Sequence, residues 1–176
     1  MSDRYIMTAF GRDRIGIVAD VTRLLYDNDC NLEDTTMNIL SDEFTLNLLF
    51  TCKENNIEEL LSSECRRLER EKGISAFVRA LPPREEKSKN GFKTCTLNIE
   101  GLDQAGIVYK TSLFLANNKL NILHLNSTSK ASPESGATIH CMDIHIQVPK
   151  EISLDKVEDD LSAMADELQV DITLSR

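Results

Sequence analysis

The chain has 176 residues, 41% hydrophobic and 28% charged, which suits a globular protein with one ordinary core or two small ones and excludes a disordered segment. Its net charge of −9 disfavours direct nucleic-acid binding, because phosphate groups need a basic surface and the arginine-rich stretch at 66–70 is interleaved with glutamates. No apolar run approaches the ~20 residues of a membrane span, and no signal peptide is visible. We therefore expect a cytoplasmic protein with no membrane partner.

The cysteines bear on the redox compartment and on metal binding. They are Cys30, Cys52, Cys65, Cys95 and Cys141. An odd number without a CxxC pair fits neither a zinc site nor a disulfide framework. We expect all of them to be reduced and mostly buried, and we expect no metal or other cofactor.

The first half of the chain predicts the element order βαββαβ. The predicted elements are a strand over 4–10, a helix with an apolar stripe over 17–25, a strand over 31–40, a strand alternating over 44–50, a helix over 57–72 and a strand over 74–81. The alternation at 44–50 places every second apolar side chain on one face of a sheet, and the spacing in each helix places one apolar stripe against it.

The second half repeats this order after a stretch of prolines, charges and Asn-Gly that is typical of a linker. We expect a first domain over 1–82, a linker over 83–92 and a second domain over 93–176. The second copy has a longer polar turn at 130–137, for which the sequence gives no role. Each domain is predicted to be an α+β ferredoxin-like sandwich, with two helices on one face of a four-stranded antiparallel sheet. The other sheet face stays open unless a second unit covers or flanks it. Such units tend to pair between chains as well as within one, so we expect homo-oligomers.

One octapeptide occurs twice, as GRDRIGIV at 11–18 and GLDQAGIV at 101–108, at a constant offset of 90. Each copy leads from a strand into a helix. We expect Gly11 to make a sharp turn with positive φ, Asp13 to cap the helix, and Gly16 to leave room for a backbone or a ligand. Free N–H groups at a helix start suit a carboxylate. A turn that serves only helix–strand packing needs the same residues, so both interpretations stay open.

Three segments of the first half resemble the ACT domain, a small-molecule regulatory module: the G-x-D-R-x-G-I-V turn, the N-L-E-D start of the second strand and the strand DEFTLNLLF. The second half resembles it through GLDQAGIV and NKLNILHLNSTSK. Two such domains and little else resemble, more narrowly, the glycine cleavage system transcriptional repressor family.

The resemblance implies an amino-acid site where paired domains meet, formed by the strand-to-helix loop and the start of the second strand. The matching positions are Asp13, Arg14, Ile15, Gly16, Ile17 and Asn31 in the first copy, and Asp103, Gln104, Ala105, Gly106, Ile107 and Asn121 in the second. Backbone N–H groups would bind the ligand carboxylate, and Asp or Asn side chains the ammonium. Because Gln104 replaces Arg14, the copies could differ in affinity, or only one could bind.

We therefore expect a non-catalytic protein that binds an amino acid, with glycine as the ligand suggested by the family. It would repress the glycine cleavage system indirectly, through a protein partner such as a DNA-binding transcription factor. No G-x-S-x-G elbow, Walker loop or HExxH motif occurs, and no ligand-spaced group accompanies His124, His140 or His145, which we interpret as satisfied or surface residues.

Two alternatives stay open. The chain could be a dimerisation or scaffold module that binds no small ligand. It could also be a small acylphosphatase-like hydrolase, because Arg12 and Arg14 lie in the first loop, although the glycine-rich phosphate cradle of that family is absent.

Overall fold

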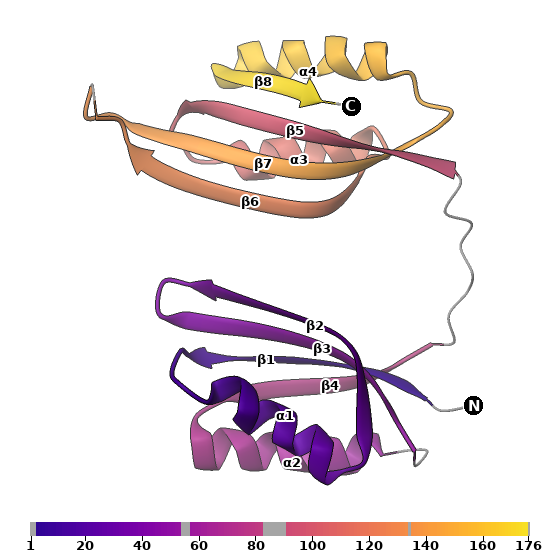
Figure 1. Cartoon of the computed structure of the whole chain (residues 1–176). Coiled ribbons are helices and arrows are strands. Elements are labelled where there is room, and N and C mark those ends of the chain that lie inside the picture. The colour runs from indigo at the N-terminus through magenta and orange to yellow at the C-terminus, as the bar shows by residue number, and fades with distance from the viewer. Residues whose placement is uncertain (1–2, 54–56, 83–90, 134, 176) are drawn as a thin grey trace. The chain divides into compact units, whose positions relative to one another are not determined.

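The computed structural model describes residues 3–53, 57–82, 91–133 and 135–175. The chain divides into two compact units, Met1–Glu86 and Lys87–Arg176, and each is described here by itself (Figure 1). Most of the predicted linker over 83–92 lies outside the described residues. The predicted domain limits at 82 and 93 therefore stay predictions.

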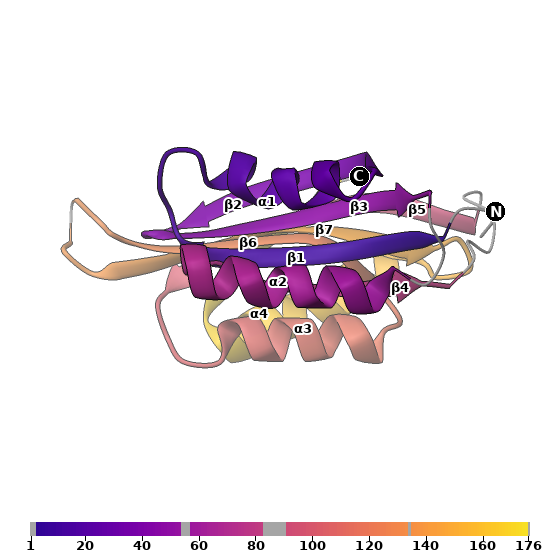
Figure 2. The ribbon, with the colours of Figure 1, turned by 90° about the horizontal axis from the view of Figure 1, so that it is seen from below.

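The first unit has the predicted element order. Its elements are β1 (Arg4–Arg12), α1 (Ile17–Asp27), β2 (Cys30–Leu40), β3 (Glu43–Cys52), α2 (Glu58–Lys72) and β4 (Ser75–Leu81). The strands form one antiparallel sheet in the order β2-β3-β1-β4. Figure 2 shows α1 and α2 side by side over one face of this sheet. The ferredoxin-like sandwich predicted from the sequence is confirmed.

The second unit repeats the plan. Its elements are β5 (Phe92–Leu102), α3 (Ile107–Asn117), β6 (Asn121–Ala131), β7 (Thr138–Pro149), α4 (Leu154–Leu168) and β8 (Val170–Ser175). The sheet order is β6-β7-β5-β8. The strand register is also repeated, because Gly11 faces Phe44 across β1 and β3 while Gly101 faces His140 across β5 and β7. Positions in the two units can therefore be compared one by one.

Strand alternation separates a core face from an open face in each unit. In β1, Tyr5, Met7 and Ala9 are buried beneath the helices. Phe10 lies on the opposite face, is 40% exposed and stacks on Phe77 of β4. This face of the first sheet thus carries large exposed apolar side chains, which is a feature of interaction surfaces. Among the described residues, no helix is both long and apolar enough to cross a membrane.

The helix that follows the octapeptide begins later than Asp13 would require. α1 begins at Ile17, its N-cap is Gly16 with φ of 85°, and no side chain caps it. A capping side chain belongs to the residue directly before the first helical turn. The prediction that Asp13 caps the helix is therefore wrong. The backbone N–H of Asp13 instead donates to the carbonyl of Asp42 at 2.7 Å.

The first glycine of the octapeptide serves close packing and not the turn. Gly11 and Gly101 lie inside β1 and β5. A Cβ at Gly11 would lie 3.1 Å from the carbonyl oxygen of Gly73, and one at Gly101 would lie 2.7 Å from Cγ1 of Val170. The turn role predicted for the first glycine is wrong, because the second glycine of each octapeptide has the left-handed conformation.

A disulfide joins Cys30 of β2 to Cys52 of β3, which face each other across the two strands. The prediction that every cysteine is reduced is wrong for this pair. Sequence spacing does not show it, because the two residues are 22 positions apart and meet only through strand register. The free cysteines are Cys65, Cys95 and Cys141. In the second unit, the corresponding positions are Leu120 and Val148, both buried.

Candidate functional site: the two strand-to-helix loops

The octapeptide places the same open turn after β1 and after β5. Gly16 and Gly106 have φ of 85° and 99°, a region that favours glycine, and a Cβ at either position would meet no atom within 4 Å. Ile17 and Ile107 are buried and anchor the two helices. The exposed loop residues are Asp13, Arg14, Ile15 and Gly16 in the first unit and Asp103, Gln104, Ala105 and Gly106 in the second. Each loop therefore presents open space above a helix start.

Backbone N–H groups face this space. The N–H of Asp20 bonds to the carbonyl of Gly16 at 3.0 Å, and that of Lys110 to the carbonyl of Gly106 at 2.9 Å. The N–H of Ile17 donates to the loop carbonyl of Arg14 at 3.3 Å. The other N–H groups that precede these two have no acceptor within the helix, and the helix dipole places positive charge beside them. With no side-chain cap on either helix, the loops can offer these donors to an anion.

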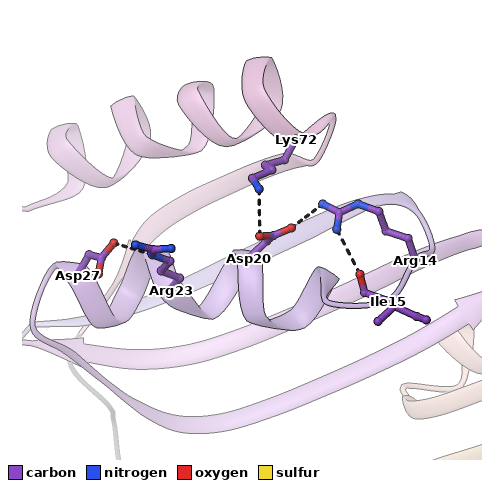
Figure 3. Close-up of polar contacts among 6 residues, drawn as sticks. All are labelled: Arg14, Ile15, Asp20, Arg23, Asp27 and Lys72. Carbon is purple, nitrogen blue, oxygen red and sulfur yellow. Dashed lines mark hydrogen bonds and ion pairs between the residues drawn. The ribbon is translucent and has the colours of Figure 1, made fainter.

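Arg14 turns back toward α1, and its Nη1 donates to the carbonyl of Ile15 in its own loop at 3.4 Å. Figure 3 shows it turned toward Asp20, with 2.6 Å between Nη2 and Oδ2, while Nζ of Lys72 lies 3.4 Å from the other carboxylate oxygen. The hydrogen bond from Arg14, followed by the effects of Lys72, lowers the pKa of Asp20 from its ordinary value of 3.8 against an opposing effect of burial. Arg14 thus forms an ion pair with Asp20, whose carboxylate also contacts Lys72.

Gln104 forms a different contact in the second loop, a hydrogen bond instead of an ion pair. Its side-chain amide donates to the carbonyl of Leu168, the last residue of α4. In the first unit, Arg14 reaches the last residue of α2, Lys72, through Asp20. Both loops therefore contact the C-terminal end of the second helix of their unit. The first loop does so through ion pairs, and the second through a hydrogen bond from a neutral amide.

The asparagines predicted from the second strand lie far from these loops. Asn31 pairs with Thr51 at the start of β2, whereas the loop follows Arg12, which pairs with Glu43 at the other end of the sheet. Eight residue steps along β1, from Arg4 opposite Thr51 to Arg12, separate the two places, which is about 26 Å. Asn121 has the same position in the second unit. The loop and the asparagine of one unit cannot contact the same small ligand, so the asparagine would serve only the loop of another domain.

A polar cluster beneath the second loop was missed by the sequence analysis. His140 is 7% exposed, and its Nε2 lies 3.1 Å from Oγ of Ser127. Its Nδ1 lies 3.3 Å from Oγ of Ser129 and 3.5 Å from Oδ1 of Asp103 in the loop. The imidazole therefore supports one of the side chains predicted to bind the ligand ammonium.

The first unit has an apolar base at the same place. The residues that correspond to His140, Ser127 and Ser129 by strand register are Phe44, Met37 and Ile39. Comparing the two halves of the sequence position by position would have revealed this exchange of three apolar residues for three polar ones.

The histidines agree with their predicted roles as satisfied or surface residues. His140 is buried toward the helices, while His145 is exposed on the opposite face, as their spacing predicts. The ring of His124 lies 5.7 Å from that of His145, edge to face. In the described part of the chain, no three His, Cys, Asp or Glu side chains are grouped so as to hold a metal ion.

Comparison with known proteins matches an ACT-domain family model over residues 4–79, in the first unit. A UPF0237 protein from Methanopyrus kandleri is 30% identical over 76 residues, which cover 43% of this chain and 84% of that protein. The glycine cleavage system transcriptional repressor of Escherichia coli is 40% identical over 52 residues, which cover 30% of this chain and 27% of the repressor. The sequence match to the repressor thus spans about a quarter of its length.

Two solved structures match over almost the whole chain. The crystal structure of an unknown protein from Galdieria sulphuraria is 26% identical, covers 99% of this chain and 98% of its own, and has a TM-score of 0.82. A structure described as a candidate glycine cleavage system transcriptional repressor is 21% identical, covers 99% of this chain and 97% of its own, and has a TM-score of 0.70. At that identity, the second likeness supports the fold alone.

Proposed function

The chain belongs to the ACT-domain family and is related to a transcriptional repressor of the glycine cleavage system, and from this premise we propose that it is a non-catalytic regulatory protein that binds an amino acid at its strand-to-helix loops. Glycine is the first ligand to test, because the repressor of Escherichia coli is named for the glycine cleavage system. The bound form would act on a partner protein.

The observation that carries this proposal is the open space over Gly16 and Gly106, next to a helix start that no side chain caps. A carboxylate fits such a place because it accepts several N–H bonds and is favoured by the helix dipole. The exposed Asp13 and Asp103 lie in the same loops and supply negative charge for an ammonium group. An amino acid carries both groups, one at each end of a short molecule.

The partner would be a protein and not nucleic acid. The net charge of −9 opposes the approach of phosphate groups, so repression would pass through a DNA-binding protein whose activity this chain changes. The uncovered sheet face that carries Phe10 and Phe77 supports self-association as well.

A thermal-shift screen of the full chain against the twenty amino acids tests the proposal. A ligand at about 100 times its Kd adds about 2.7 kcal/mol of stability, which is several degrees for domains of this size. Gly16→Leu and Gly106→Leu fill the open space in each loop and should abolish the shift in the copy that binds. Gly136→Leu is the matched control, because Gly136 has φ of 69° with nothing within 4 Å but lies in the β6–β7 turn.

A shift with one amino acid that survives Gly136→Leu and is lost in a loop variant identifies both the ligand and the copy that binds it. If no amino acid changes the melting temperature, ligand binding at these loops is rejected, and a scaffold or dimerisation module without a small ligand becomes the better description.

Hydrolysis of an activated ester is a second candidate with one observation in its favour. Ser127, His140 and Asp103 follow the order of a nucleophile, a base and an orienting carboxylate. Ser129, however, is closer to Nδ1 of His140 than Asp103 is. Turnover of p-nitrophenyl acetate that is lost in Ser127→Ala and retained in Ser129→Ala would establish this activity, and no turnover above that of free imidazole would reject it.

A further inference from the structure

The two helices of the second unit border an open groove of about 600 Å³ with an apolar floor and polar or charged residues beside it. Its apolar lining consists of Tyr109, Leu113 and Phe114 from α3 and Ala163 and Met164 from α4. Tyr109 is 69% and Leu113 44% exposed, so large apolar side chains face water there. One ion pair, 2.9 Å between Lys110 and Glu167, links the two helices across the groove.

The same place in the first unit is polar. The groove between α1 and α2 has a volume of about 400 Å³, and charged residues make up most of its lining. Arg23 stands at the position of Leu113 and pairs with Asp27 at 3.4 Å, and Lys72 pairs with Asp20 across the helices (Figure 3). The first groove is thus filled with ion pairs that water can solvate, whereas the second exposes apolar surface.

The charge around the second groove indicates what could cover it. α4 carries six acidic residues and one lysine. Asp160 and Glu167 line the groove together with Lys110 of α3, which pairs with Glu167, so the lining keeps one net negative charge. A second copy of this chain that docked through the same groove would bring the same acidic α4, so like charges would face each other there. A basic segment meets the acidic rim favourably, and apolar side chains on one face of that segment would cover Tyr109 and Leu113.

We propose that the α3–α4 groove of the second unit is the docking surface for a partner protein and that it binds a basic amphipathic helix. Apolar residues at positions i, i+3 or i+4 and i+7 enter the groove, and a lysine or arginine beside them meets Asp160, because Glu167 already pairs with Lys110. The inference rests on the proposed function only in that a regulatory chain needs a surface for its partner. The groove is separate from the loop residues assigned to the amino acid.

The probe is a fluorescent 15-residue peptide of leucine and lysine with leucines at helical spacing, titrated into the full chain and followed by anisotropy. A scrambled peptide of the same composition keeps the charge and loses the apolar face. The wild-type chain should bind the first peptide at least about tenfold more tightly than the second, because only the ordered peptide buries apolar surface.

Leu113→Arg installs the residue that the first unit has at this position and should weaken peptide binding by about tenfold or more. Leu60→Arg is the matched control: Leu60 lies on α2 of the first unit, is 48% exposed against 44% for Leu113, and the substitution adds the same charge. The control should bind the peptide nearly as tightly as the wild-type chain does. Circular dichroism and urea unfolding check that both variants are folded.

Equal binding of the two peptides, or equal weakening by Leu113→Arg and Leu60→Arg, would overturn the proposal, since binding would then reflect net charge. Sedimentation in which the wild-type chain dimerises and Leu113→Arg is monomeric would also overturn it, because the groove would then bind a second copy. The amino-acid thermal shift is measured on the same variants. It should be unchanged by Leu113→Arg, so failure of docking and failure of amino-acid binding give separate signals.

Discussion

The two units share a backbone plan and differ in what lies beneath the strand-to-helix loop. In the first unit, the fully buried ring of Phe44 fills the space. In the second, His140 bonds to two serines and contacts Asp103 of the loop itself. The comparison shows that a duplicated turn can rest on an apolar or a polar base. It also shows that Asp103 has a partner that its counterpart Asp13 does not have.

This difference bears on ligand binding at the two loops. To bind an ammonium group, Asp103 would have to share its carboxylate with His140 or give up that contact. Asp13 has no histidine beneath it, because Phe44 takes that place. We therefore expect the two loops to differ in affinity for the same amino acid, and exchanging the buried residues is the most direct way to sharpen the comparison.

The largest effect is expected for Phe44→His. The substitution removes a large apolar side chain from the core and places an unpaired polar group there, which should lower the free energy of unfolding of the first unit by about 3–5 kcal/mol. Urea unfolding of the full chain, followed by circular dichroism, measures it. A loss below about 1 kcal/mol would show that the first unit can form a polar base as readily as the second.

Reduction of the Cys30–Cys52 disulfide should have the next largest effect. The bond closes a loop across 22 positions, and chain entropy alone predicts a loss of about 3 kcal/mol in the first unit. The second unit holds Leu120 and Val148 at these positions and should be unaffected by reductant. A thiol titration in denaturant without reductant should count three cysteines. A count of five would contradict the disulfide.

His140→Phe should cost less than the reverse exchange, about 1–2 kcal/mol in the second unit. The substitution breaks the bonds to Ser127 and Ser129, but Ser129 is exposed and Ser127 only partly buried, so water can replace the histidine at both. Adding Ser127→Met and Ser129→Ile rebuilds the base of the first unit and should recover part of the loss in the same urea experiment. A triple variant that is less stable than His140→Phe would show that the two bases are not interchangeable.

The smallest effect is expected for Asp20→Asn, which releases Arg14 and Lys72 at the surface. At neutral pH the loss should be at most about 1 kcal/mol. Because the folded-state pKa of Asp20 is lowered, its ion pairs stabilise the protein above the ordinary pKa of 3.8 and stop doing so as pH falls below it.

The wild-type chain should therefore lose more stability than the variant between about pH 5 and pH 3. Arg14→Gln copies the residue of the second unit and should reduce the same acid-dependent loss. If the free energy of unfolding of the wild-type chain and of Asp20→Asn fell in parallel over this pH range, the ion pairs of Asp20 would not be the source of the acid-dependent loss.

The order of elements could be predicted from sequence because it depends on local patterns. Alternation from Phe44 to Phe50, the apolar stripe of α1 and the repeated octapeptide each lie within a short segment. Element ends were less accurate: Asp13 is too far from Ile17 to cap α1.

The features that the sequence did not reveal depend on pairing between distant strands. Cys30 meets Cys52, and His140 meets Ser127, only through the register of neighbouring strands. The position of Asn31, at the far end of the sheet from its loop, follows from the same register. Residue types alone nominated the loop correctly as an open turn, but they could not show that Arg14 is already paired with Asp20.

The last turn of α4 is held from two sides, by Gln104 at Leu168 and by Lys110 at Glu167. A ligand that drew Gln104 toward itself would loosen the helix that forms one wall of the α3–α4 groove. Amino-acid binding at the loop and partner binding at the groove would then be thermodynamically coupled. Each ligand would change the affinity of the other by the same factor. In the first unit, the loop contacts the second helix through the ion pairs of Arg14, Asp20 and Lys72. Raising the ionic strength would weaken these ion pairs and leave the Gln104 hydrogen bond of the second unit almost unchanged.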